Sequence, residues 1–269
     1  LEIEASEQPR RATLERVWRQ ASRGLAVIAS GAAAQPVRYA VGKDCTLRYA
    51  YRAHMMVVQT MPAGLRPSGS QQEGVVELEA VAAAVNGVQA LRLLSLSSRT
   101  TRVADGVRTR GAVDTRPAVV ALSSDGLTLT SQTKQPPWSY GGAFSGLTVF
   151  WPPLAAGDAK ANWTLPQGVA AVSAVGWRKI DDVTALVLSA TLAKPWRVLV
   201  GSTRARSDFL GRFVVTRSGR LLHAAWVGQV DVRDELSATR QRHVHRYEAR
   251  LVSACDGPTL PTLLTATKP

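Results

Sequence analysis

The chain has 269 residues, of which 45% are hydrophobic and 20% are charged, and this composition excludes global disorder. No run of eighteen or more apolar residues occurs, so the sequence predicts no membrane-spanning helix. The formal net charge is +13, but the basic residues are spread along the chain, which favours a generally basic surface, or attraction to an anionic membrane surface or glycan, over nucleic-acid binding.

The first predicted element is an amphipathic helix over residues 9–33. Leu14, Trp18 and Leu25 follow the three-and-four spacing of one helix face, while arginines occupy much of the other. Three interpretations stay open: a helix docked on a sheet, an interfacial membrane helix, and a retained targeting segment that includes the run GLAVIASGAAA.

The rest of the chain is almost wholly β in character. Asn86-Gly87, between two apolar runs, is the strongest hairpin signal, because a type I′ turn requires positive φ at both central residues. The polar residues 61–73 predict a loop. The predicted strands and hairpins cover residues 38–59, 75–85, 88–97, 103–109, 117–132, 168–180, 183–192, 197–202, 212–232 and 243–255.

Two of these segments have the same order of features. Residues 117–132 and residues 212–232 each contain an apolar run, a Gly-containing break and a second apolar run. Together with the similar runs that begin at Val85 and Ile180, they indicate two related meanders, although chance similarity between apolar hairpins is the alternative. The predicted organisation is one structural domain with a helical segment at 1–34, meanders at 35–133 and 161–256, an aromatic, Pro/Gly-rich linker at 134–160 and a loose tail at 257–269.

The two cysteines, Cys45 and Cys255, lie near the first and last predicted long strands. Cys45 shares its strand face with Tyr49 and Tyr51, and Cys255 shares its face with Leu251. Two cysteines on inward faces can meet if their strands are neighbours, so we predict a disulfide and an oxidising compartment. Two free buried thiols are the alternative.

Residues that could carry chemistry are few. His243 and His245 lie on one face of a strand and could begin a metal site, with His223 or Asp231 as a third ligand. The favoured interpretation is that these histidines are ordinary half-buried polar residues. No serine elbow, phosphate loop or metal motif occurs, and a turn accounts for Asp181-Asp182. We therefore predict no catalytic residues, no metal and no cofactor.

The predicted fold is mainly β: a large, strongly curved antiparallel sheet, half-barrel or barrel-like, with one N-terminal helix against its concave face. Gly157-Asp158, Trp163, residues 211–215 and Gly219 resemble a segment of the LolA/LppX type of periplasmic half-barrel lipoprotein and of related uncharacterised bacterial lipoproteins. The resemblance implies a twisted sheet with helical cover over an apolar cavity, and it transfers no catalytic residue.

These features predict a non-catalytic bacterial envelope protein, periplasmic or secreted, with membrane association as a further expectation. It would bind or carry a lipid or other apolar ligand between the curved sheet and the helix. The alternative is an envelope interaction module that binds a protein or glycan through its surface. The candidate ligand-binding residues are Trp18, Leu25, Tyr49, Tyr51, Trp151 and Trp226.

Overall fold

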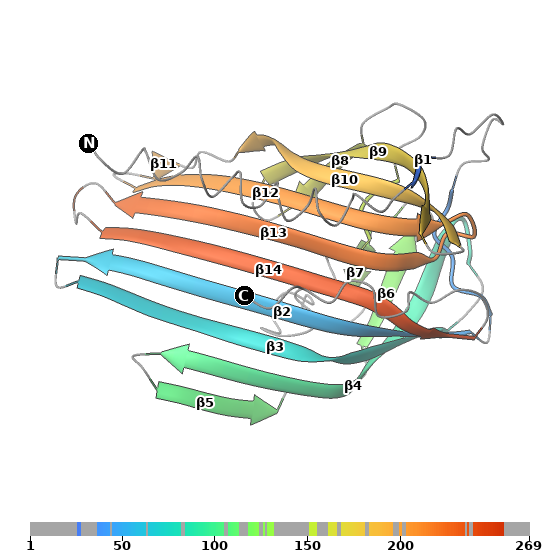
Figure 1. Cartoon of the computed structure of the whole chain (residues 1–269), viewed down its shortest axis with the longest axis horizontal. Coiled ribbons are helices and arrows are strands. Elements are labelled where there is room, and N and C mark those ends of the chain that lie inside the picture. Colours follow the sequence, from blue (N-terminus) through green and yellow to red (C-terminus); the bar gives the residue numbers. More distant parts are fainter. Residues whose placement is uncertain are drawn as a thin grey trace.

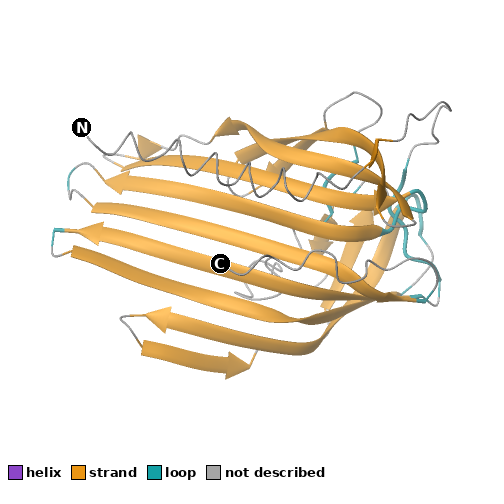
Figure 2. Cartoon of the chain, in the orientation of Figure 1, coloured by secondary structure: helices purple, strands orange, loops and turns teal. Residues whose placement is uncertain are grey.

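Strands are the only regular secondary structure in the described part of this computed structural model (Figure 2). The structure describes residues 26–27, 37–43, 45–62, 64–81, 84–104, 107–112, 118–123, 126, 128–131, 151–154, 161–165, 168–180, 183–195, 199–200, 203–234, 236 and 239–255. Within these residues no helix has the length and apolar character that crossing a bilayer would require.

In the part of the chain that the structure describes, fourteen strands form one antiparallel sheet (Figure 1). Their bounds are β1 (Ala26–Val27), β2 (Thr46–Met61), β3 (Gly64–Ala80), β4 (Val88–Ala104), β5 (Val107–Ala112), β6 (Ala118–Ser123), β7 (Thr128–Ser131), β8 (Ala161–Leu165), β9 (Gly168–Ile180), β10 (Val183–Pro195), β11 (Leu199–Val200), β12 (Thr203–Thr216), β13 (Leu221–Asp234) and β14 (Thr239–Ala254). The main order is β1-β9-β10-β12-β13-β14-β2-β3-β4-β6-β7, while β8 pairs with β9, β11 with β12 and β5 with β4.

The described sheet is curved but does not close on itself. Figure 1 shows it curving away from the viewer at the end where β6 and β7 lie, and β7 and β1 end the strand order without pairing to each other. The prediction of a mainly β protein with one large antiparallel sheet is therefore confirmed, and the described sheet is open rather than closed into a barrel.

The first and last long strands lie side by side in the middle of the sheet. β14 pairs with β2 over most of its length, from Arg240 opposite Thr60 to Ala254 opposite Leu47. Cys45 precedes β2 and Cys255 follows β14, and the two form a disulfide with a Cα–Cα distance of 5.3 Å. The predicted disulfide is present.

Three predicted hairpins are confirmed. Asn86 and Gly87 both have positive φ, and Val85 and Val88 exchange two backbone hydrogen bonds across them, as a two-residue type I′ hairpin requires. The hairpin of residues 212–232 is β12–β13, closed where the Gly219 N–H donates to the Thr216 carbonyl. The hairpin of residues 117–132 is β6–β7, with Gly126 at positive φ.

Three other predictions are wrong. Residues 61–73 belong mostly to β3 rather than to a loop, and β4 pairs with β3 only as far as Ser68. Pro67 therefore lies beyond the end of the pairing between β3 and β4, a position that tolerates its missing N–H. Residues 103–109 are not one strand, because β4 ends at Ala104 and the reversed β5 begins at Val107.

The third correction concerns the N-terminal helix. Ala26–Val27 forms the short strand β1, which pairs with Lys179 and Arg178 of β9, so these two residues are not helical as the sequence predicted. A small apolar run that ends in a β-branched residue can add to a sheet edge at low cost. The remainder of the predicted helix, including Trp18 and Leu25, lies outside the described residues.

Candidate ligand-binding face

Cross-strand register divides the sheet into two chemically different faces. Residues directly opposite one another share a face, so Tyr49 lies on the same face as its partners Leu251 and Val76. We call this the inner face. The other face, which carries arginine at positions such as Arg48 and Arg52, is the outer face.

At one end of the strands the inner face is completely filled. Tyr49 has no exposed surface, and its hydroxyl donates to the Leu221 carbonyl oxygen at 2.8 Å. Trp151 is also buried in the hydrophobic core. The Val41 N–H donates to Gln89 Oε1 at 3.0 Å, and Gln89 Nε2 donates to the Val41 carbonyl at 2.7 Å, which ties a non-strand segment to β4. We call this region the closed end.

An aromatic belt of Phe209, Trp226 and Tyr247 crosses the inner face next to the closed end. The Trp226 ring centroid lies 5.7 Å from that of Phe209 and 5.8 Å from that of Tyr247. Phe209 is directly opposite Gly228, and Trp226 is directly opposite Gly211. A glycine opposite each ring leaves space for the bulky side chain, because there is no competing Cβ.

The belt contains one unsatisfied donor. Trp226 is 7% exposed, and its indole Nε1 has no hydrogen-bond partner in the part of the chain that the structure describes. Nearby on the same face, Gln72 Nε2 donates to the Tyr51 hydroxyl at 3.0 Å. A buried donor without a partner costs free energy, and this one lies at the boundary of the filled region.

Beyond the belt the inner face is only half-buried. We call this region the open inner face, and its side chains are Met55, Val57, Val230, Val232, His243 and His245. Met55 is 38% exposed. Burial, followed by the charge of His243, lowers the pKa of His245, so the imidazole is held in its neutral form.

The structure places the predicted ligand-binding residues in different environments. Trp226 lies in the belt on the inner face, as strand parity predicts. Tyr49, Tyr51 and Trp151 are buried among the core residues. Contact of these residues with a ligand stays a prediction.

Sequence reasoning did not select the other residues of the belt and of the open inner face. Strand parity places Tyr247 on the face of Leu251 and Cys255, but the pairing of β12, β13 and β14 was needed to bring Tyr247 and Phe209 together with Trp226. Alternation of Phe209, Gly211 and Phe213 along β12 was the available signal, because glycine in a strand often marks close approach of a bulky group.

The histidine arrangement does not support the three-ligand metal site. His243 and His245 lie on the inner face, whereas His223 and Asp231 pair with Arg250 and Arg242 on the outer face. Among the described residues no group of three or more metal-ligating side chains comes together. His223 Nε2 instead lies 3.3 Å from Glu248 Oε1.

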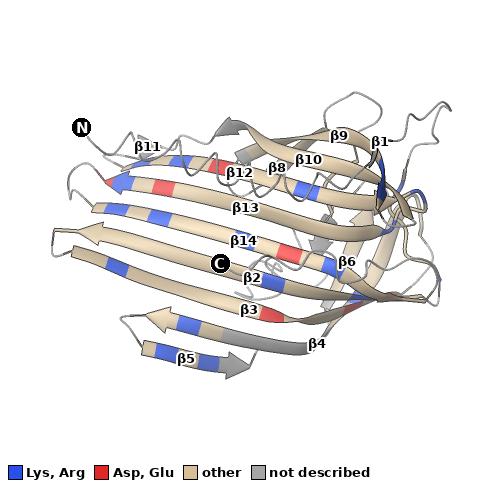
Figure 3. Ribbon diagram, in the orientation of Figure 1, with Lys and Arg blue, Asp and Glu red and all other residues tan. Residues whose placement is uncertain are grey.

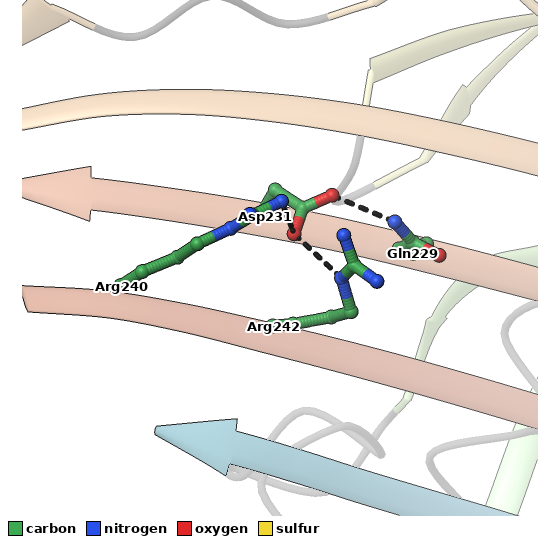
Figure 4. Close-up of polar contacts among 4 residues, drawn as sticks. All are labelled: Gln229, Asp231, Arg240 and Arg242. Atoms are coloured by element: carbon green, nitrogen blue, oxygen red, sulfur yellow. Dashed lines mark hydrogen bonds and ion pairs between the residues drawn. The ribbon is translucent and has the colours of Figure 1, made fainter. Parts of the chain in front are cut away.

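Asp231 organises a polar cluster on the outer face (Figure 4). Its Oδ1 accepts from Arg242 Nε at 2.9 Å and Arg240 Nη2 at 3.3 Å, while Oδ2 accepts from Gln229 Nε2 at 2.6 Å. Burial alone would raise the pKa of Asp231, but these hydrogen bonds and the two arginine charges outweigh it and lower the pKa. The carboxylate stays ionised and neutralises part of the basic outer face.

Comparisons with known proteins support the fold alone. No family model and no curated relative matches the sequence. A solved structure that concerns lipid–protein interactions in lipovitellin matches with a TM-score of 0.55 and 13% identity, covering 82% of this chain and 26% of the lipovitellin chain. The chain thus spans about a quarter of that protein's length, with a similar sheet architecture.

Two other solved structures have much lower TM-scores. A proposed outer membrane lipoprotein-sorting protein domain from Vibrio parahaemolyticus has a TM-score of 0.16 and 6% identity, over 76% of this chain and 84% of that one. A DUF1329 family protein from Desulfovibrio piger has a TM-score of 0.13 and 11% identity, over 77% and 85%. At these TM-scores neither structure supports a similarity in fold, and the resemblance to LolA/LppX lipoproteins stays a prediction.

Proposed function

We propose that the protein is a non-catalytic, extracytoplasmic binding protein that holds an amphiphilic, lipid-like ligand against its open inner face. The observation that carries the proposal is the decrease in side-chain burial along that face. The face passes from a filled aliphatic core through the aromatic belt to partly exposed Met55, Val57 and Val230 beside two histidines.

Each part of this face suits one part of an amphiphile. Methionine and valine side chains that are left partly exposed can cover an acyl chain, since removing apolar surface from water is favourable. His243 and His245 can hydrogen-bond to a polar group. The similarity in fold to part of lipovitellin, a protein studied for its lipid–protein interactions, supports the same class of ligand.

The disulfide supports the location. Cys45 and Cys255 are separated by 210 residues, and a bond of this kind persists in oxidising compartments. An extracytoplasmic protein that binds lipid would meet its ligand at the cell envelope.

The test combines native mass spectrometry of gently purified protein with titration of a soluble fluorescent fatty acid. Val230→Gln should weaken fatty-acid binding about tenfold or more, because a polar group replaces an apolar contact worth about 1.5 kcal/mol. Val227→Gln is the matched control: both valines are half-buried on β13, but Val227 lies on the outer face opposite Arg246. Equal binding by both variants, or a lipid-free complex with another protein, would overturn the proposal.

A further inference from the structure

A group of apolar side chains is exposed on the outer face, at the corner formed by β2, β3, β4 and β5. Met56 is 38% exposed, Leu65 67% and Val103 37%. Met56 and Val103 lie in one row of the register, each opposite Gly69. Leu65 lies four register rows further along on the same face, opposite Thr60.

Arginines flank this apolar group, and the parts of β2, β3, β4 and β5 that form the corner are poor in acidic residues, with Asp105 between β4 and β5 in the sequence. Arg108 is directly opposite Val103, and Arg110 is opposite Thr101. The sequences of β4 and β5 contain five arginines and no aspartate or glutamate, and their described parts carry basic but no acidic bands in Figure 3. Residues 54–71 also contain no aspartate or glutamate.

The polar cluster around Asp231 does not offset this positive charge. Arg242 and Arg240 lie directly opposite Val58 and Thr60 of β2, and both are bound to Asp231. Two guanidinium groups around one carboxylate leave a net positive charge beside the corner. The net charge of the whole chain is also positive, with a formal value of +13.

We infer that this corner patch, made of Met56, Leu65, Val103, Arg108 and Arg110, docks the protein on an anionic lipid bilayer. Apolar side chains at a strand corner can enter the headgroup region, while arginines bind lipid phosphates. Charge complementarity selects this occupant: the arginines beside the apolar group outnumber Asp105, the acidic residue between β4 and β5, and an anionic bilayer offers both phosphates and an apolar interior.

The inference goes beyond ligand binding and does not depend on it. Met55 and Met56 are neighbours on β2 with side chains on opposite faces, so the corner patch lies across the same strand from the open inner face. Docking through this corner would bring the open inner face close to a source of lipid.

Vesicle co-sedimentation tests the inference with the full chain. Vesicles of phosphatidylcholine with about 30% phosphatidylglycerol should bind the protein at least tenfold more tightly than phosphatidylcholine alone, and added salt should weaken the binding. The double variant Arg108→Gln with Arg110→Gln should lose about 25-fold, since each basic residue at an anionic surface contributes about fivefold. Leu65→Glu should also weaken binding, and its 67% exposure makes the change tolerable to the fold.

The matched control is Arg38→Gln with Arg206→Gln, which removes the same charge from exposed positions outside the corner. An equal loss in both double variants would overturn the inference, because net charge alone would then explain binding. Equal affinity for neutral vesicles would also overturn it. So would absence of vesicle binding together with self-association that Leu65→Glu abolishes, which would assign the corner to a second copy. Fatty-acid titration without vesicles reports on the proposed function separately, so either proposal can fail alone.

Discussion

The protonation of His245, on the open inner face, makes the stability of the protein depend on pH. Its pKa is lowered in the folded protein by burial and by the neighbouring His243, so the unfolded chain binds the proton more strongly. Stability therefore rises with pH between the folded pKa and the ordinary value near 6.5, and it is lost as the pH falls through that window.

We expect the free energy of unfolding to decrease as the pH is lowered from about 7.5 to about 5.5. The contribution of His245 to the slope cannot exceed about 1.4 kcal/mol per pH unit, the value for one proton. His245→Gln should flatten the curve, as measured by denaturant unfolding at several pH values. A steeper curve in the variant would contradict this. His54, whose pKa burial and Arg246 also lower, supplies part of the remaining slope.

At the same scale, alternation alone predicted which side chains point inward. Cys45, Tyr49, Tyr51 and Met55 share one parity, and the structure places Tyr49 and Met55 on the same face of β2. Parity could not predict which of these inward-facing side chains are buried and which are exposed. Tyr49 is buried and Met55 is partly exposed, and the difference depends on which distant segments fill the closed end. Such contacts leave no periodic signal in the strand itself.

The turns decide how the elements assemble. Gly219 closes β12–β13 with φ of +80°, and a Cβ there would overlap the carbonyl oxygen of Arg38. The Ala40 N–H donates to the Gly219 carbonyl, so the N-terminal approach to β2 crosses directly over this turn. The turn therefore needs glycine both for its backbone conformation and for the packing of a second segment.

Gly219→Ala should lower the free energy of unfolding by about 3 kcal/mol or more, because strain at positive φ adds to displacement of the backbone at Arg38. Gly176→Ala is the control: Gly176 also has positive φ, at +123°, but nothing lies within 4 Å of its Cβ position. Its cost should be about 1–2 kcal/mol. Denaturant unfolding compares the two, and equal losses would mean that the contact with Arg38 relaxes freely.

At the element scale, strand pairing overrode one local signal, and a second, correct signal was overlooked. The Pro- and Gly-containing residues 61–73 predict a loop from composition, yet β2 offers a full-length partner and β3 pairs with it from Gly64 onward. In the opposite sense, Asp105-Gly106 is a favourable hairpin dipeptide that sequence reasoning passed over, and β4 and β5 reverse there. A turn dipeptide can be interpreted only when the strands that pair on either side of it are known.

At the scale of the whole molecule, the order of the sheet explains why the chain ends matter. β2 and β14 are neighbours at its centre, so the two meanders are joined by the pairing of the first and last long strands. The sequence predicted the disulfide from parity at both ends. It could not predict the pairing partner of each strand, because the apolar runs of this sheet differ little from one another and strand order depends on long-range contacts.

The disulfide holds this central junction in the unfolded state as well. Cross-linking Cys45 to Cys255 constrains nearly the whole chain, and loop-closure entropy gives an upper estimate of about 5 kcal/mol for so long a loop. Cys45→Ser with Cys255→Ser should therefore lower the free energy of unfolding by up to that amount, without loss of β structure in circular dichroism. A thiol assay on denatured, unreduced wild-type protein should find no reactive thiol. Detection of two reactive thiols would show that the disulfide is absent, and an oxidising compartment would then lose its support.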